Sequence, residues 1–302
     1  MNNQALALIG APLLIVGIFS LHQYIHAPTY TVVPLPSTQT AQVTATANTR
    51  PEKTVADTVS ATSIGSSTPS KTVSAPQPLV SYIEITTGCT TALDDTCVTA
   101  YSQPSTTSQK RSPLRVGSLL RTKGSTTTAD GTVWYEITFP EYIRYEERLT
   151  LPWFIPAAYG TIIRTNGPEE LTLQTPTSTK RLIVDRSEQR MYAYDGDTLH
   201  ATYTISTGRD LTPTPRGTFT IFKKMPSRYM QGPIPGISTN YYDLPGVPWN
   251  LYFTEQGAIV HGAYWHNSFG TQWSNGCVNV PLEHARAVYE WADLGATVTV
   301  RD

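Results

Sequence analysis

The feature that most limits how this chain folds is a long tract with few side chains that could be buried in a core. Over residues 31–80, 18 of 50 residues are Ser or Thr, six are Pro, and Phe, Trp and Tyr are absent. Without aromatic side chains to bury, such a segment cannot offset the conformational entropy that it loses on ordering. We therefore predict a disordered linker over residues 27–79, with ordered structure after it.

An uncharged apolar run precedes this linker, at residues 5–21. Its length is at the short end of what crosses a bilayer as a helix. A cleaved secretory signal peptide is the alternative, although no Lys or Arg precedes the run as such a peptide requires. We expect residues 1–26 to form an N-terminal helix that anchors the chain in a membrane, with the signal peptide as the second interpretation.

The charge of the chain limits the classes of partner. Lys and Arg number 22 and Asp and Glu number 23, the formal net charge is -1, and no basic run occurs. Nucleic-acid binding depends on clustered Lys and Arg that release counterions from phosphates. We therefore expect no nucleic-acid partner. The 302 residues suggest two folded domains, or one domain with long unstructured stretches.

Short β-type runs separated by polar loops follow the linker. The loops contain Gly124 and the pair Asp130-Gly131, the turn residues expected between strands of a small all-β module. We place this module over residues 80–165. Its expected strands cover residues 82–85, 97–101, 114–116, 118–121 and 132–137.

The chain has three cysteines, an informative number in an exported protein. Cys89 and Cys97 are separated by seven residues, which allows a local disulfide in an oxidising compartment. Two free buried cysteines are the alternative. If the two pair, Cys277 is the odd thiol, which must pair between chains, stay inert or react.

From Arg181 onward the pattern is again rich in strands, with one helix. The expected strands cover residues 182–185, 190–194, 201–205, 218–221, 258–261 and 297–300, and a hairpin joins the first two. Within residues 281–292, Leu282, Ala285 and Val288 fall on one helical face, which predicts an amphipathic helix. The sequence therefore predicts a mainly β chain with one helix near its end.

The residues suited to nucleophilic chemistry are concentrated in two stretches near the end of the chain, residues 261–266 and 274–279. A thiol attacks well only as its thiolate, so a catalytic Cys277 needs an imidazole, such as that of His261, to take its proton and hold the ion pair. Gly276 allows a tight turn in which backbone amides converge on an oxyanion. An inert buried cysteine with a core histidine is one alternative. Three zinc ligands, His261, His266 and Cys277, are another.

The ordered motifs of this region resemble one enzyme family. The string AIVHGAYWHNSFG, followed by SNGCVNVP, resembles the active-site motif of the YkuD-type L,D-transpeptidases, in which a His-Gly pair precedes Ser/Thr-His-Gly-Cys. The string Ser206-Thr207-Gly208 and residues 212–219 are similar to the family's conserved glycine and Thr-Pro-x-Gly turn. The resemblance implies a β-sandwich-like catalytic domain with one C-terminal helix over residues 178–302.

A second resemblance concerns the middle segment. The strings VTAYSQP, LRVGSLLRTKG and DGTVWYEI resemble bacterial SH3-like domains, which commonly flank cell-wall enzymes. This implies a small β-barrel over residues 80–165 that binds wall peptides or positions the catalytic domain. A packing or spacer domain is the alternative.

The transpeptidase resemblance implies a role for each motif residue. Cys277 is the expected nucleophile and His261 the general base, and the Gly262 carbonyl orients the imidazole. The amides of Gly276 and Cys277 are expected to line an oxyanion hole. One position departs from the family, because Asn275 stands where His is usual, and Asn does not titrate. The residues expected to shape the turn or line the substrate site are Ser274, Asn275, Asn279, His266 and Tyr242. No metal ion or cofactor is expected.

The family cleaves and re-forms peptide bonds in the stems of bacterial peptidoglycan. The resemblance implies a thioester on Cys277 and a cross-link between two third-position diamino acids. Transfer to water would instead make the chain an L,D-carboxypeptidase, and a non-catalytic wall-binding protein is a further alternative. Residues 225–242, rich in Pro, Gly and Tyr, are the expected lid, with a plain surface loop as the alternative. The implied location is the bacterial cell envelope, with the catalytic domain outside the cytoplasm.

Overall fold

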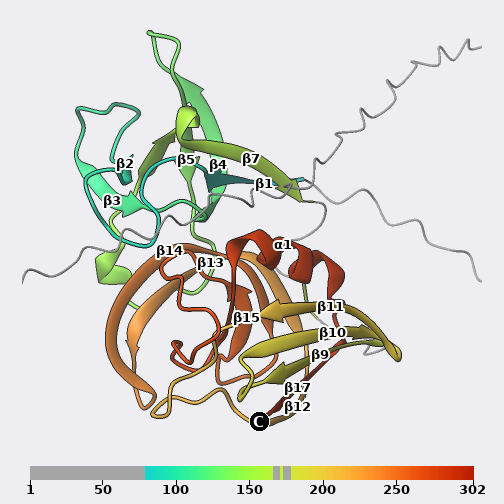
Figure 1. Ribbon diagram of the computed structural model, residues 1–302. Coiled ribbons are helices and arrows are strands. Elements are labelled where there is room, and N and C mark those ends of the chain that lie inside the picture. Colours follow the sequence, from blue (N-terminus) through green and yellow to red (C-terminus); the bar gives the residue numbers. More distant parts are fainter. Residues whose placement is uncertain (1–78, 166–170, 173–177) are drawn as a thin grey trace, which may run out of the picture. The chain divides into compact units, whose positions relative to one another are not determined.

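A computed structural model describes residues 79–165, 171–172 and 178–302 of the chain (Figure 1). The expected membrane anchor at residues 1–26, and all but the last residue of the expected linker, lie outside the described residues. The described residues belong to one compact unit, Lys71–Asp302. Within these ranges, no helix combines the length and the apolar character that crossing a membrane takes.

Seven strands of residues 80–165, the N-terminal β module, form one sheet in the order β3-β2-β6-β5-β4-β1-β7. The order ends at β3 and β7, so the described strands make an open sheet and not the small barrel expected from the SH3 resemblance. Strand β1 pairs with β7, which no sequence pattern predicts, as well as with β4. The strands are β1 Val80–Ile85, β2 Val98–Tyr101, β3 Lys110–Leu114, β4 Leu119–Thr127, β5 Val133–Ile137, β6 Trp153–Pro156 and β7 Gly160–Thr165.

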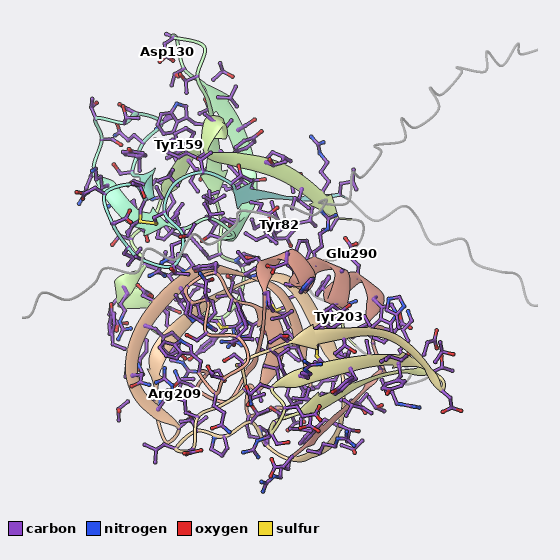
Figure 2. The ribbon with its side chains drawn as sticks, viewed as in Figure 1. Tyr82, Asp130, Tyr159, Tyr203, Arg209 and Glu290 are labelled. Carbon is purple, nitrogen blue, oxygen red and sulfur yellow. A yellow bond between two sulfur atoms is a disulfide. The ribbon has the colours of Figure 1, made fainter. Side chains whose placement is uncertain are left out.

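Alternate residues of β1 are buried in two different hydrophobic clusters. Tyr82, labelled in Figure 2, belongs to the cluster that fills the C-terminal region, whereas Ile83 belongs to the cluster inside the module. On the paired strand β4, Leu119 and Leu120 divide in the same way. Successive side chains of a strand point to opposite faces, so both faces of this part of the sheet are covered. The module and the C-terminal region therefore share a core.

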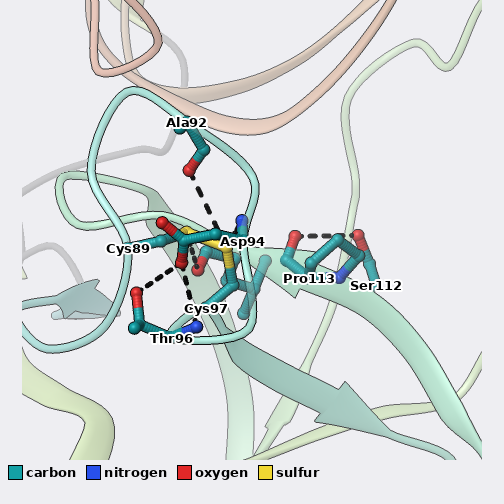
Figure 3. Close-up of a disulfide and its surroundings, with 8 residues drawn as sticks. Cys89, Ala92, Asp94, Thr96, Cys97, Ser112 and Pro113 are labelled. Carbon is teal, nitrogen blue, oxygen red and sulfur yellow. Dashed lines mark hydrogen bonds between the residues drawn. A yellow bond between two sulfur atoms is a disulfide. The ribbon is translucent and has the colours of Figure 1, made fainter.

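Cys89 and Cys97 form a disulfide in the loop between β1 and β2, with 2.06 Å between the sulfur atoms (Figure 3). The Asp94 carboxylate accepts hydrogen bonds from the backbone N–H and the hydroxyl of Thr96 in the same loop. The Cys89 carbonyl oxygen accepts a hydrogen bond from the Val116 N–H at 2.8 Å. The disulfide loop is thereby attached to the turn that precedes β4.

The C-terminal region consists of two five-stranded sheets, in the orders β11-β10-β9-β17-β12 and β16-β15-β14-β13-β8. Most neighbouring strands are antiparallel, but β9 with β17 and β15 with β16 are parallel. The strands are β8 Leu171–Thr172, β9 Lys180–Asp185, β10 Arg190–Asp195, β11 Thr198–Thr204, β12 Gly217–Thr220, β13 Lys223–Ile234, β14 Ser238–Tyr252, β15 Ile259–Gly262, β16 Val278–Val280 and β17 Thr297–Arg301.

Helix α1, Leu282–Trp291, follows β16 and contacts β14 and β15 (Figure 1). Its buried residues are Ala285, Val288 and Tyr289, on the face that the helical spacing predicts. These side chains share one cluster with buried residues of both sheets, such as Val184 of β9 and Val260 of β15. A mainly β fold with one helix near its end is thus confirmed.

Residues 225–242, the expected lid, lie mostly in strands. They form most of β13 and the start of β14, which are 12 and 15 residues long and pair as one antiparallel hairpin. The pairing has register shifts, one of them between Arg228 and Met230. The segment is therefore a β-hairpin and not a plain surface loop. Its Pro and Gly residues concealed the strands, because both types are depleted from strands.

Candidate active site

Strands β15 and β16 bring His261 and Cys277 to one cavity. The two strands are parallel, and His261 is the register partner of Asn279. Cys277 directly precedes β16 and lies two residues before Asn279. Both residues line a cavity of about 700 Å³. The two side chains that the motifs single out therefore line one cavity.

The His261 imidazole is buried and is held by the next residue of its own strand. Its Nδ1 lies 3.0 Å from the carbonyl oxygen of Gly262. A carbonyl only accepts hydrogen bonds, so Nδ1 carries the proton and Nε2 keeps its lone pair. The Trp265 ring stacks on the imidazole, with 5.6 Å between the centroids. His261 is thus held in the tautomer that accepts a proton at Nε2.

Burial determines the protonation of both groups. Burial lowers the pKa of His261 to about 4, while the Gly262 hydrogen bond opposes this shift and the charge of Arg228 adds to it. Burial raises the pKa of the Cys277 thiol, against a backbone hydrogen bond from Ile259 and the charge of Arg228. Both shifts follow from the cost of desolvating a charge. At neutral pH the pair is therefore a neutral thiol and a neutral imidazole, and not the ion pair expected from the sequence.

Gly262 has no room for a side chain. A Cβ at this position would lie 2.9 Å from the Cβ of Ala285 and 3.0 Å from the Cγ of Pro248. Helix α1 and strand β14 therefore approach the end of β15 too closely for any residue but glycine. The same contacts keep the Gly262 carbonyl in place beside the His261 ring.

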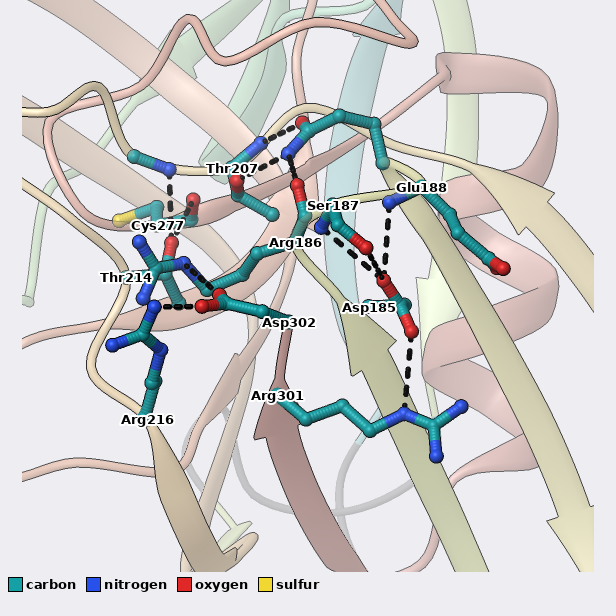
Figure 4. A network of polar contacts seen from close by, with 12 residues as sticks. Asp185, Arg186, Ser187, Glu188, Thr207, Thr214, Arg216, Cys277, Arg301 and Asp302 are labelled. Atoms are coloured by element: carbon teal, nitrogen blue, oxygen red, sulfur yellow. Dashed lines mark hydrogen bonds and ion pairs between the residues drawn. The ribbon is translucent and has the colours of Figure 1, made fainter.

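Two hydroxyl groups hold the loop that carries Cys277. The Ser274 hydroxyl donates to the Cys277 carbonyl oxygen at 2.6 Å. The Thr214 hydroxyl donates to the same oxygen at 3.3 Å (Figure 4). The Gly276 N–H in turn donates to Ser274 Oγ at 3.1 Å. This bond occupies the Gly276 amide, which corrects the expectation that it lines an oxyanion hole.

The upstream motif lies against this loop. Ser206 pairs with Asn279, and Gly208 pairs with Ser274, in two isolated β-bridges. The Gly208 N–H donates to Thr214 Oγ1 at 2.9 Å. A Cβ on Gly208 would lie 2.1 Å from a backbone carbonyl oxygen of the same turn, so this position requires glycine. The separated motifs of the sequence therefore form one connected support for Cys277.

His266 is buried and makes polar contacts through both ring nitrogens. Its Nδ1 accepts from the Ser268 N–H at 3.1 Å, and its Nε2 lies 2.7 Å from the side-chain amide of Asn279. Because Nδ1 accepts, the neutral ring carries its proton on Nε2 and must face an acceptor. Turning the Asn279 amide so that Oδ1 faces Nε2 satisfies both groups, whereas the reverse orientation leaves Oδ1 buried without a partner. His266 is therefore a buried support for Asn279 and is not among the residues that line the cavity, although it was expected to shape the turn or line the substrate site.

The zinc alternative requires ligand atoms from His261, His266 and Cys277 to converge. Both ring nitrogens of His266 are already engaged, which leaves no lone pair for a metal ion. In the part of the chain that the structure describes, the ligand atoms that do converge belong to Asp94 and the two disulfide cysteines. The geometry therefore does not support a zinc site at Cys277.

The chain has recognisable relatives. Residues 179–300 match the sequence model of the L,D-transpeptidase catalytic domain, the YkuD family. These residues form a YkuD-type L,D-transpeptidase domain. A curated relative from Bacillus licheniformis, named as a candidate L,D-transpeptidase YkuD, is 30% identical over 117 residues, which are 38% of this chain and 59% of the relative. The match thus spans less than two thirds of that relative.

Solved structures of L,D-transpeptidases are also similar to the chain. One from Enterococcus faecium is 22% identical with a TM-score of 0.37, and the match covers 41% of this chain and 50% of that chain. The L,D-transpeptidase of Mycobacterium smegmatis is 21% identical with a TM-score of 0.39, and the match covers 57% of this chain and 91% of that chain.

In the transpeptidase domain, Asn275 and Tyr242 both line the cavity. Asn275 Oδ1 accepts a hydrogen bond from the Asn240 amide at 3.1 Å, which connects the cysteine loop to β14. Burial raises the pKa of Tyr242 to about 12, and the nearby Cys277 thiol adds to the shift. The Tyr242 hydroxyl therefore keeps its proton at neutral pH and can donate it in a hydrogen bond to a substrate.

The N-terminal β module supplies part of the cavity wall of the transpeptidase domain. Arg115 and Ser118, in the turn before β4, line the cavity, and so do Leu93, Ser112 and Pro113. None of these residues belongs to a catalytic motif, so sequence patterns do not point to them. Their position at the site follows from the shared core of module and domain.

Another part of the module holds the β13–β14 hairpin. The Tyr145 hydroxyl donates to the Pro233 carbonyl oxygen, and the Arg148 guanidinium donates to that of Gly232, each at 2.7 Å. The Arg148 guanidinium also lies 3.8 Å from the centroid of the Tyr145 ring and 4.6 Å from that of Tyr241. The module therefore restrains the tip of the hairpin that lines the transpeptidase cavity.

Proposed function

We propose that the chain is a peptidoglycan L,D-transpeptidase that forms cross-links between third-position diamino acids through a thioester on Cys277. The observation that carries the proposal is the cavity shared by the Cys277 thiol and the His261 imidazole, whose tautomer leaves Nε2 as the proton acceptor. The family match over residues 179–300 supports the same reaction. The substrates are peptide stems of the bacterial cell wall.

The reaction proceeds in two transfers. The Cys277 sulfur attacks the carbonyl carbon of the third stem residue while its proton passes to Nε2 of His261. The C–N bond then breaks, and the leaving amine of the terminal D-Ala takes the proton from the imidazolium. An amine on an acceptor stem next attacks the thioester and gives a proton to Nε2, which returns it to the departing thiolate. The Gly262 carbonyl stabilises the imidazolium in both transfers.

Water is the competing acceptor, and its use would make the enzyme an L,D-carboxypeptidase. The cavity is lined by aromatic side chains, among them Tyr241, Tyr242 and Trp273. Such a lining gives an acceptor peptide apolar surface to cover, and a bound peptide displaces water from the thioester. This favours transfer to an amine over hydrolysis.

The location proposed for the enzyme is the cell envelope, with residues 1–26 as its membrane anchor and the catalytic domain outside the cytoplasm. The Cys89–Cys97 disulfide supports an oxidising compartment, because disulfides are rare in a reducing cytosol.

A carbapenem, which acylates a reactive nucleophile, tests the assignment of Cys277. Intact-mass spectrometry of the full chain should show one covalent adduct on the wild type and none on Cys277→Ala. His261→Gln keeps the thiol and removes the base, so acylation should slow by about 10²-fold or more. No adduct on the wild type, or an equal adduct on Cys277→Ala, would contradict the proposal. With a stem tetrapeptide, the ratio of dimer to tripeptide separates transpeptidation from hydrolysis.

A further inference from the structure

The cavity contains a cation that no described protein group neutralises. Arg115 is half-buried and lines the same cavity as Cys277 and His261. Its Nε atom is buried and has no hydrogen-bond partner among the described residues. Its guanidinium also forms no ion pair with any described residue. A charge withdrawn from water without a partner costs folding free energy. A bound ligand would supply the partner that the Arg115 guanidinium lacks.

The turn that carries Arg115 is held on two sides. The Val116 N–H donates to the Cys89 carbonyl oxygen at 2.8 Å, and so attaches the turn to the disulfide loop. The Gly117 N–H donates to the Ile85 carbonyl oxygen, also at 2.8 Å. Gly117 has φ +91°, and a Cβ there would lie 2.3 Å from a side-chain carbon at the start of α1. The backbone that positions the guanidinium is therefore preorganised, which lowers the entropy cost of binding.

The other charged side chains of the cavity are hydrogen-bonded or exposed, unlike that of Arg115. Asp243 is the one acidic residue among the described residues that line it, and its carboxylate accepts a hydrogen bond from Gln231 at 3.1 Å. Arg209, the second cation of the lining, is exposed, and its guanidinium lies 4.7 Å from the centroid of the Trp273 ring. A partly desolvated cation attracts an anion more strongly than one in water. Of the two arginines that line this cavity, Arg115 is thus the better placed for an anionic partner.

We propose that Arg115 of the N-terminal β module binds a carboxylate of the peptide that reacts at Cys277, so that the module forms part of the substrate site. The proposal rests on the proposed function for its substrate class. A guanidinium presents a fork of N–H donors that matches the two oxygens of a carboxylate. Stem peptides carry more than one carboxylate, and amidating one at a time identifies the group that Arg115 binds.

Peptide binding to the full-length Cys277→Ala chain measures this recognition without catalysis. The ligands are a stem tetrapeptide with all carboxylates free and versions amidated at one carboxylate each. In calorimetric titrations, Arg115→Gln in this background should weaken binding of the free peptide about tenfold or more, the range for hydrogen bonds to charged groups. Amidation of the carboxylate that Arg115 binds should weaken binding to the same extent as Arg115→Gln. For that amidated peptide, Arg115→Gln should cause no further loss of affinity.

Two further variants control for charge and fold. Arg164→Gln removes the same charge from an exposed site on β7, away from the cavity lining, and should leave the Kd unchanged. Arg115→Lys keeps the charge without the fork and should recover part of the affinity. In the chain that retains Cys277, an unchanged rate of iodoacetamide alkylation in Arg115→Gln would show that the cysteine loop is undisturbed.

The outcomes separate this proposal from the proposed function. Equal affinity with and without Arg115, equal losses for the free and every amidated peptide, or no peptide binding at all would each overturn the role of Arg115. If the wild type forms no carbapenem adduct while binding still depends on Arg115, the acyl-transfer proposal fails and the carboxylate site remains.

Discussion

Asn279 and His266 form a buried pair, with 2.7 Å between the side-chain amide and the imidazole Nε2. Asn279 is also the register partner of His261 on β15 and exchanges two backbone hydrogen bonds with Ser206. The pair therefore connects β16, which follows Cys277, to β15, which carries His261, and to the upstream motif. These contacts hold β16 against its neighbours beside the cavity.

Removing the imidazole should destabilise the fold. His266→Ala leaves the Asn279 amide buried with an unsatisfied group, which should lower the free energy of unfolding by about 2 kcal/mol. His266→Gln retains a donor and should lose less. Urea unfolding at pH 7.5 measures both changes. Identical stability of His266→Ala and the wild type would contradict the assigned pairing.

Stability should fall in mild acid. Burial lowers the pKa of both His261 and His266 to about 4, below the value of about 6.5 for an unfolded histidine. Between pH 6.5 and 4 the unfolded chain therefore binds more protons than the folded chain, so stability decreases as the pH falls through this window. We expect a loss on the order of 2 kcal/mol per histidine at pH 4.5 relative to pH 7.5. Urea unfolding at the two pH values measures it, and His266→Gln should show about half the loss.

Cys277 should react as a thiol that is neutral at pH 7. Burial raises its pKa, so the thiolate is scarce at pH 6 and becomes populated only above the ordinary thiol range. The rate of iodoacetamide alkylation, followed by intact mass, should rise steadily from pH 6 to pH 9 and lie below that of a small-molecule thiol. A stable thiolate-imidazolium pair would instead give a rate that is level across this range, which is the result that refutes a neutral pair.

Gly262→Ala should damage both stability and acylation. The added Cβ would meet Ala285 at 2.9 Å and Pro248 at 3.0 Å, which should cost about 1–3 kcal/mol as overpacking. The shift would also move the carbonyl that holds His261 Nδ1 and slow acylation by a carbapenem. Gly124→Ala is the control, because a Cβ there meets no atom within 4 Å. Equal behaviour of the two variants would argue against the close approach at Gly262.

Thiol titration tests the cysteine assignment. The unreduced, denatured chain should contain one titratable sulfhydryl, that of Cys277, because Cys89 and Cys97 are joined. Reduction before titration should raise the number to three. Three sulfhydryls without reduction would show that the disulfide is absent.

Residue patterns within a single segment predicted the helix and the hairpin that form within that segment. The helical spacing of Ala285 and Val288 predicted α1, and its observed bounds, Leu282–Trp291, differ from the expected ones only at the ends. The hairpin of β9 and β10 also agrees with the expected strands. The strand expected at residues 114–116 instead lies at Lys110–Leu114, where Pro113 obscured the alternating pattern. Strands β13 and β14 were missed for the same reason.

The sequence by itself determined which residues are proposed to carry the chemistry, because the order of its motifs singled out Cys277, His261 and Gly262 without any geometry. Tertiary structure alone decided their protonation, since burial raises one pKa and lowers the other. It also decided that Gly276 is already hydrogen-bonded and that Arg115 reaches the cavity. These properties depend on desolvation and on contacts between distant segments, which the local spacing of residues does not record.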